Sequence, residues 1–176
     1  MKHVLHEPFT KDKLKELKAG DTVLLTGTIY AARDAAHRKL NELIANGDPL
    51  PLQIENQIIY YMGPTPARPG YPIGAAGPTT SYRMDNFTPA LLELGLSGMI
   101  GKGPRSEEVM HCAQENGAVY FAAIGGAGAL IAQSIKASEV VAFAEMGTEA
   151  IRSLYVEDMP LIVAYDTQGG DVFSRG

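Results

Sequence analysis

Short apolar segments alternate with helix-forming segments along this chain, and that alternation is the sequence feature that most constrains its fold. The runs at 22–26, 58–62 and 118–124 have the length and composition of strands, whereas 31–45 and 106–115 are rich in helix formers. Strands are also predicted at 98–100, 139–144 and 160–165, and helices at 11–17, 86–94 and 127–135. This alternation predicts an α/β fold with a largely buried sheet flanked by helices, and a length of 176 residues predicts one domain, 1–176.

The composition excludes several classes of protein. The net charge is −5, whereas a nucleic-acid surface draws on clustered lysines and arginines, so we predict no nucleic-acid partner. The longest uncharged run, 116–135, holds four glycines and polar side chains, which predicts a buried strand entering a helix and no membrane span. Cys112 is the single cysteine, so this chain alone builds neither an internal disulfide nor a multi-cysteine metal site, and such usage predicts a cytoplasmic protein.

A first candidate site lies in the string GTIYAARDAAH at 27–37, where a predicted strand turns into a helix. Ligands of sheet proteins bind beyond the carboxyl ends of strands, and a helix N-terminus adds positive partial charge there. Arg33 is therefore placed to bind an anion. The alternative is that Arg33 and Asp34 are solvated charges of the first helical turn and that His37 lies on the helix surface.

A second candidate is the string GPTTSYRMD, which ends a long Pro- and Gly-rich loop at 63–87. Hydroxyl groups and backbone N–H groups on a turn can hold a carboxylate, and an arginine can bind one through two parallel hydrogen bonds. Thr79, Thr80 and Arg83 are thus candidate ligands of an anion. The alternative is an ordinary Thr or Ser cap on the helix that follows.

A third candidate is Lys102 in the string MIGKG, directly after a predicted strand. Flanking glycines let the backbone approach a ligand, although a lysine in a turn usually faces solvent. The glycine-rich string IGGAGAL at 124–130 lacks the third glycine of a dinucleotide fingerprint, so we interpret it as small residues that permit tight helix packing.

Three strings, TGTIYAARDAAHRKL, GPTTSYRMD and MIGKG, follow one another between residues 26 and 103, and together they resemble the C-terminal domain or β subunit of class I fumarases and related tartrate dehydratases. The later string LIVAYDTQGG is also similar to this family. Two positions depart from its pattern: Ala32 stands where a threonine is frequent, and Tyr82 where a small residue is common. Neither departure removes a charged side chain.

The resemblance implies a swivelling β/β/α domain that docks on an α subunit. That partner would carry a [4Fe-4S] cluster, so the complex would be a hetero-oligomer, with self-association also open, and this chain would bind no cofactor itself. The resemblance assigns substrate contacts to Arg33, Thr79, Thr80, Arg83 and Lys102, supporting positions to Asp34, His37 and Asp85, and the proton-transfer position to Thr79.

The activity implied by the resemblance is that of a hydro-lyase acting on a small dicarboxylate. Fumarases usually have IYTARDAAH, and IYAARDAAH is nearer to them, which favours reversible hydration of fumarate to (S)-malate. Conversion of L(+)-tartrate to oxaloacetate stays open as an alternative. So does a function of another class, a stand-alone anion-binding module.

Overall fold

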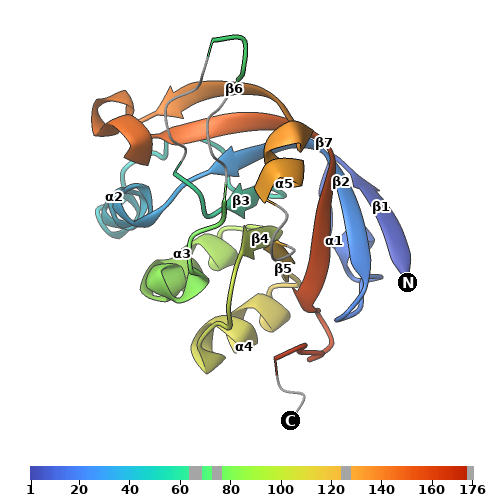
Figure 1. Ribbon diagram of the computed structural model, residues 1–176. Helices are drawn as coiled ribbons and strands as arrows, with labels where there is room; N and C mark the ends of the chain where they lie inside the picture. Colours follow the sequence, from blue (N-terminus) through green and yellow to red (C-terminus); the bar gives the residue numbers. More distant parts are fainter. Residues whose placement is uncertain (64–68, 73–76, 124–127, 174–176) are drawn as a thin grey trace.

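Strands and helices alternate in the computed structural model, which describes residues 1–63, 69–72, 77–123 and 128–173 (Figure 1). The strands are β1 (Lys2–His6), β2 (Thr22–Ala31), β3 (Ile58–Tyr60), β4 (Gly98–Gly101), β5 (Val119–Ala123), β6 (Ile135–Ala142) and β7 (Ile151–Tyr165). The α-helices are α1 (Lys11–Leu14), α2 (Asp34–Ala45), α3 (Thr88–Glu93), α4 (Glu107–Glu115) and α5 (Gly128–Ser134), and the 3₁₀ helices are η1 (Ser81–Phe87) and η2 (Ala144–Glu149).

These strands form a sheet in the order β1-β2-β3-β4-β5-β7-β6. Neighbours from β1 to β5 are parallel, whereas β7 runs antiparallel to β5, β6 and β2. Because β2 pairs with β7 as well as with β3, the strands between them close into a barrel, and β1 and β6 lie outside the ring. The predicted mixed α/β class is confirmed, and the closure of the sheet is an addition that the sequence pattern did not predict.

Two apolar cores lie on opposite faces of the parallel strands. Successive side chains of a strand point to opposite faces, so Ile58 and Tyr60 enter one core, while Ile59 and Tyr61 enter the other. Residues of α2, α3 and α4 complete the second core, and these helices lie along one side of the sheet (Figure 1). Burial on both faces explains why 58–62 is continuously apolar.

Most predicted elements are present, but several bounds differ: β2 extends to Ala31 instead of residue 26, α2 begins at Asp34 instead of residue 31, and η1 lies within the predicted loop 63–87. Ser106 caps α4 by accepting a hydrogen bond from Val109 N at 3.2 Å. Helix α1 ends at Leu14 instead of residue 17, and Thr10 makes no side-chain capping bond. The edge strand β1 was not predicted, β6 spans 135–142 instead of 139–144, and β7 begins at 151 instead of 160.

The predicted strand and helix within the uncharged run 116–135 are both present, as β5 and α5. Most of the glycine-rich string at 124–130 lies outside the described residues. Across the described ranges, no helix combines the length and the apolar character that a membrane crossing requires.

Candidate functional site

The candidate site lies at the carboxyl ends of the parallel strands β2, β3 and β4. Because these strands run in the same direction, Arg33 after β2 and Lys102 after β4 leave the sheet at the same edge. The segment before η1 joins this edge: Thr79 N–H donates to the carbonyl of Tyr61 at 2.7 Å, and Thr80 forms a parallel bridge with Lys102. The fold therefore brings the three predicted segments together.

Arg33 is paired with a carboxylate that the sequence analysis did not single out. Its Nε donates to Glu149 Oε2 at 2.9 Å, and the two side chains are 26% and 28% exposed. The β2–β7 ladder places Ala31 opposite Arg152, so residues just beyond β2 meet residues just before β7, although Arg33 and Glu149 are 116 positions apart. The alternative that Arg33 is a solvated first-turn charge is therefore wrong.

Gly63 lies directly against the Arg33 guanidinium. A Cβ atom added at Gly63 would overlap Nε, Cζ and Nη2 of Arg33, so any other residue would displace this side chain. Within the described part of the chain, the structure records no hydrogen bond from the terminal nitrogens of Arg33. Arg33 is thus fixed at Nε and against Gly63, and none of the described residues forms a recorded hydrogen bond with its terminal nitrogens.

Arg83 joins η1 to the first turn of α2 through a second ion pair of the same kind. Its Nε donates to Asp34 Oδ2 at 3.0 Å, and the Arg83 and Asp34 side chains are 46% and 24% exposed. Asp34 Oδ1 is buried without a hydrogen-bond partner among the described residues. Thr80 precedes η1 but makes no capping bond, so the alternative of an ordinary cap does not hold for its side chain.

His37 is buried, and the alternative that it lies on the helix surface is wrong, because this face of α2 packs on the sheet. Burial lowers the pKa of His37 to about 4, so the ring is neutral near pH 7. Its Nδ1 lies 2.8 Å from the carbonyl oxygen of Arg33 and must therefore donate to it. The ring also packs edge-on against Tyr61, with 5.4 Å between centroids. His37 therefore holds the start of α2 in place.

Lys102 is exposed, and the structure records no partner for its ammonium group among the described residues. Its carbonyl accepts a hydrogen bond from Ser81 N–H at 2.9 Å. The Ser81 hydroxyl occupies the space that a Cβ atom at Gly101 would fill, and it lies 2.6 Å from the Tyr120 hydroxyl. Gly101 therefore permits close packing of η1 on β4, and not the approach of a ligand that we predicted for it.

A buried arginine, Arg105, adjoins these residues and was missed in the sequence. Its side chain is 0% exposed, and Nε donates to Asp85 Oδ1 at 2.7 Å. Its Cζ lies 5.0 Å from the ring centroids of both Tyr61 and Tyr120. The other Asp85 oxygen accepts from Ser106 N–H at 2.8 Å. Asp85 thus ties η1 to the start of α4, and the only sequence signal for Arg105 is its place directly after the string GKGP.

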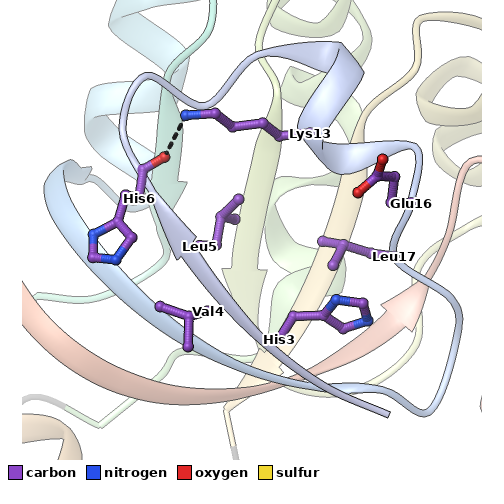
Figure 2. Close-up of a pocket in the computed structure, with 7 residues that line it drawn as sticks. All are labelled: His3, Val4, Leu5, His6, Lys13, Glu16 and Leu17. Atoms are coloured by element: carbon purple, nitrogen blue, oxygen red, sulfur yellow. Dashed lines mark hydrogen bonds between the residues drawn. The ribbon is translucent and has the colours of Figure 1, made fainter.

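The pocket drawn in Figure 2 lies elsewhere, on β1 and the α1 region. It is lined by His3, Val4, Leu5, His6, Lys13, Glu16 and Leu17. β1 pairs with residues 22–26, the first half of β2, whereas the candidate site follows the end of that strand. His3 bonds to Asp21 at 2.8 Å and Lys13 to the His6 carbonyl at 3.1 Å. The predicted site residues do not line this pocket.

Cys112 behaves as a packing thiol. Burial raises the pKa of Cys112, and its Sγ lies 3.9 Å from the carbonyl oxygen of Pro89. In the described ranges there is no group of three or more His, Cys, Asp or Glu side chains that could hold a metal ion. Iron–sulfur clusters are bound by several cysteine thiolates, so one thiol does not fit such a group.

The entire sequence matches one protein family, described as Fumarase C-terminus, over residues 1–176. The chain belongs to this family. The candidate site is thus a feature of a fumarase C-terminus domain, in keeping with the resemblance of its three strings.

Relatives of this fumarase C-terminus domain have two lengths. This chain is 43% identical over 165 residues to the anaerobic class I fumarate hydratase of Escherichia coli K12, and the match covers 93% of this chain and 30% of the relative. Fumarate hydratase 2 of Leishmania major is 38% identical over 167 residues, covering 94% and 29%. The putative L(+)-tartrate dehydratase subunit beta of Methanocaldococcus jannaschii is 39% identical over 172 residues, covering 94% and 88%. The chain therefore spans less than a third of these fumarate hydratases and most of that β subunit.

Proposed function

We propose that this chain is the dicarboxylate-binding part of a hydro-lyase that interconverts fumarate and (S)-malate. The observation that carries the proposal is that Arg33, the Thr79–Thr80 segment and Lys102 meet at one edge of a barrel from the fumarase C-terminus family. The [4Fe-4S] cluster would belong to a counterpart, which is either an α subunit or the remainder of a longer polypeptide. The domain would dock on this counterpart as a swivelling β/β/α unit, in the cytoplasm.

The charges at the edge support a dianionic substrate. Three cations, Arg33, Arg83 and Lys102, stand near two carboxylates, Glu149 and Asp34, so these five residues leave one net positive charge. A guanidinium binds a carboxylate through two parallel hydrogen bonds, and the outer edge of Arg33 is suited to this contact. Each end of the substrate would thus meet a cation, and the overall negative charge of the protein would not repel it locally.

The reaction adds a proton to one alkene carbon and a hydroxyl group to the other. When malate loses its C–H proton, negative charge spreads onto the adjacent carboxylate, and fixed cations stabilise that charge. Arg33, Arg83 and Lys102 would supply these cations and orient the substrate. Thr79 is proposed at the proton-transfer position; because a threonine hydroxyl is a weak base, it would act only with a stronger base that takes its proton. The cluster of the counterpart would supply a Lewis acid for the hydroxyl group.

Reconstitution tests this proposal. The purified chain alone is expected to show no hydration of fumarate, and mixing it anaerobically with a cluster-bearing counterpart is expected to produce that activity. Activity from the chain alone would overturn the division of labour. Fumarate binding by the chain alone, without activity in any mixture, would instead favour a stand-alone anion-binding module.

Tartrate dehydration is the second candidate, favoured by one specific observation. The relative named as a putative L(+)-tartrate dehydratase subunit beta is 39% identical to this chain and is matched over 88% of its own length. The assembled enzyme should be assayed with L(+)-tartrate and with (S)-malate at equal concentrations. A higher kcat/KM for (S)-malate supports the fumarase proposal, and a higher value for tartrate replaces it.

A further inference from the structure

We propose that Glu149 is a positioning residue that presents Arg33 to one carboxylate of the substrate, an inference that rests on the function proposed above. Glu149 lies in η2, far in sequence from the three strings that carry the family resemblance. Its role would be to fix the guanidinium through Nε, so that the two terminal nitrogens face outward as a pair.

The position of Glu149 is well defined by its surroundings. It is followed directly by Ala150 and Ile151, which are 4% and 1% exposed. At the other end of η2, the partly buried Phe143 packs against the second core, and its ring centroid lies 5.8 Å from Lys39 Nζ of α2. The connection between β6 and β7 is therefore anchored at both ends, to α2 through Phe143 and in the second core through Ile151, which fixes the position of Glu149 beside Arg33.

The geometry of the contact favours positioning over competition with the substrate. A carboxylate that occupied the substrate's place would take two parallel hydrogen bonds from the guanidinium. The Glu149 carboxylate instead accepts one bond, from Nε, at 2.9 Å. Gly63 closes the space beside Nε, Cζ and Nη2 and so limits rotation of the guanidinium. A ligand carboxylate can then approach the outer edge without displacing Glu149.

Arg83 repeats the arrangement independently. The Nε of Arg83 donates to Asp34 Oδ2 at 3.0 Å, and Asp34 is partly buried at the start of α2. Two arginines at one edge are thus each held at the inner nitrogen by a carboxylate from another element. An ion pair that only neutralised charge could form at any nitrogen of the guanidinium, whereas both of these ion pairs use Nε.

The test uses the assembled enzyme, this chain with its cluster-bearing counterpart, and fumarate as substrate. Glu149→Ala is expected to raise KM about tenfold with a smaller fall in kcat, because Arg33 remains but is no longer oriented. Glu149→Gln keeps an oxygen acceptor for Nε and is expected to recover most of the loss. Glu145→Ala, an exposed carboxylate on the same helix, is the matched control and is expected to leave KM unchanged.

The outcomes separate this inference from the proposed function. If Arg33→Ala abolishes activity but Glu149→Ala behaves like Glu145→Ala, the positioning role fails and the proposed function stands. A lower KM in Glu149→Ala would show that Glu149 competes with the substrate, which also overturns the inference. If Arg33→Ala has no effect, the proposed site itself is wrong. Should Glu149→Ala not fold, Glu149→Met, which fills the space without an acceptor, takes its place and must show the same rise in KM.

Discussion

Two neighbouring arginines of this protein are paired with carboxylates in opposite ways. Arg105 is 0% exposed, and its guanidinium bonds to Asp85, to Thr88 Oγ1 at 3.0 Å and to Met99 Sδ at 3.4 Å. Arg33 is 26% exposed and bonds to Glu149 through one nitrogen. Each nitrogen of the Arg105 guanidinium has a hydrogen-bond partner, whereas the two terminal nitrogens of Arg33 have no recorded hydrogen bond to the described residues.

The two arginines differ in how much of each guanidinium is bonded to other residues of the protein. A buried, fully paired guanidinium fixes the elements around it, here η1 and the start of α4, and cannot accept a ligand. A partly exposed guanidinium with one ion pair contributes little to stability, and Arg33 is the one that we propose binds a carboxylate. Substitution of Arg105 is therefore expected to affect mainly stability, and substitution of Arg33 mainly activity.

Replacement of Arg105 is expected to have the largest effect. Arg105→Met removes a fully buried cation and leaves the Asp85 carboxylate, whose side chain is 12% exposed, without its ion-pair partner, so the free energy of unfolding should fall by about 3–5 kcal/mol. Urea denaturation of the purified chain measures this change. Arg33→Met serves as the control, with an expected loss of about 1 kcal/mol or less because its ion pair is partly exposed. Equal losses in the two variants would contradict the comparison.

Arg33→Met, which is expected to cost less stability than Arg105→Met, should nevertheless cause a large loss of activity. Removing a cation that stabilises charge in the transition state is expected to lower kcat/KM for fumarate by about 10²–10³-fold in the assembled enzyme. Thermal unfolding should confirm that the fold is retained. A variant that stays folded and keeps full activity would exclude Arg33 from the site.

The buried His37 should make stability depend on pH. Because burial lowers the pKa of His37 to about 4, the unfolded chain binds a proton below pH 6.5 that the folded chain does not. This contribution to stability is therefore complete above pH 6.5 and is lost as the pH falls towards 4, by about 3 kcal/mol in all. Urea denaturation between pH 7.5 and 4.5 should show a smaller fall for His37→Gln than for the wild type; identical falls would mean that the ring accepts its proton in the folded state.

Gly63→Ala tests how closely Arg33 must be held, with the smallest expected effect. The added methyl group overlaps the guanidinium, so kcat/KM should fall about tenfold as the side chain moves aside. Gly47→Ala is the control: it places a methyl group where nothing lies within 4 Å but at φ +72°, so it should cost stability and leave kcat/KM unchanged. Unchanged activity in Gly63→Ala would show that Arg33 can bind its ligand from another orientation.

Local patterns in the sequence predicted those parts of the fold whose signals are local. The strands buried on both faces, such as β3 and β5, are apolar runs, and α4 begins at a serine cap. β1 was not predicted and β6 was misplaced, because edge strands are largely exposed and lack such apolar runs. β6 has one buried residue, Ile135. The closure of β2 on β7 depends on pairing between distant segments, which no local pattern records.

In the candidate site, too, residues with a local sequence signal could be predicted, and a residue brought in by distant pairing could not. Arg33, Thr79 and Lys102 could be singled out because each follows a strand or a turn in its own string. The partner of Arg33 could not be predicted, because Glu149 is 116 positions away and its sequence context carries no signal of the ion pair. Sequence reasoning thus singled out the proposed ligand-binding groups and Asp34, the carboxylate that pairs with Arg83, but it missed Glu149, the carboxylate that pairs with Arg33.

The irregularity in the β2–β7 ladder bears on how this protein tolerates insertions. Leu25 lies opposite Met159 and Gly27 opposite Val156, so β7 carries one residue more than β2 at that place, where Asp158 has φ 52°. Beyond it the register runs unbroken to Ala31 opposite Arg152, two residues before Arg33 and three after Glu149. One strand residue spans about 3.3 Å, more than the length of the ion pair itself. A one-residue insertion on one side of this ladder would therefore separate Arg33 from Glu149, unless a matching insertion on the other strand restored their alignment.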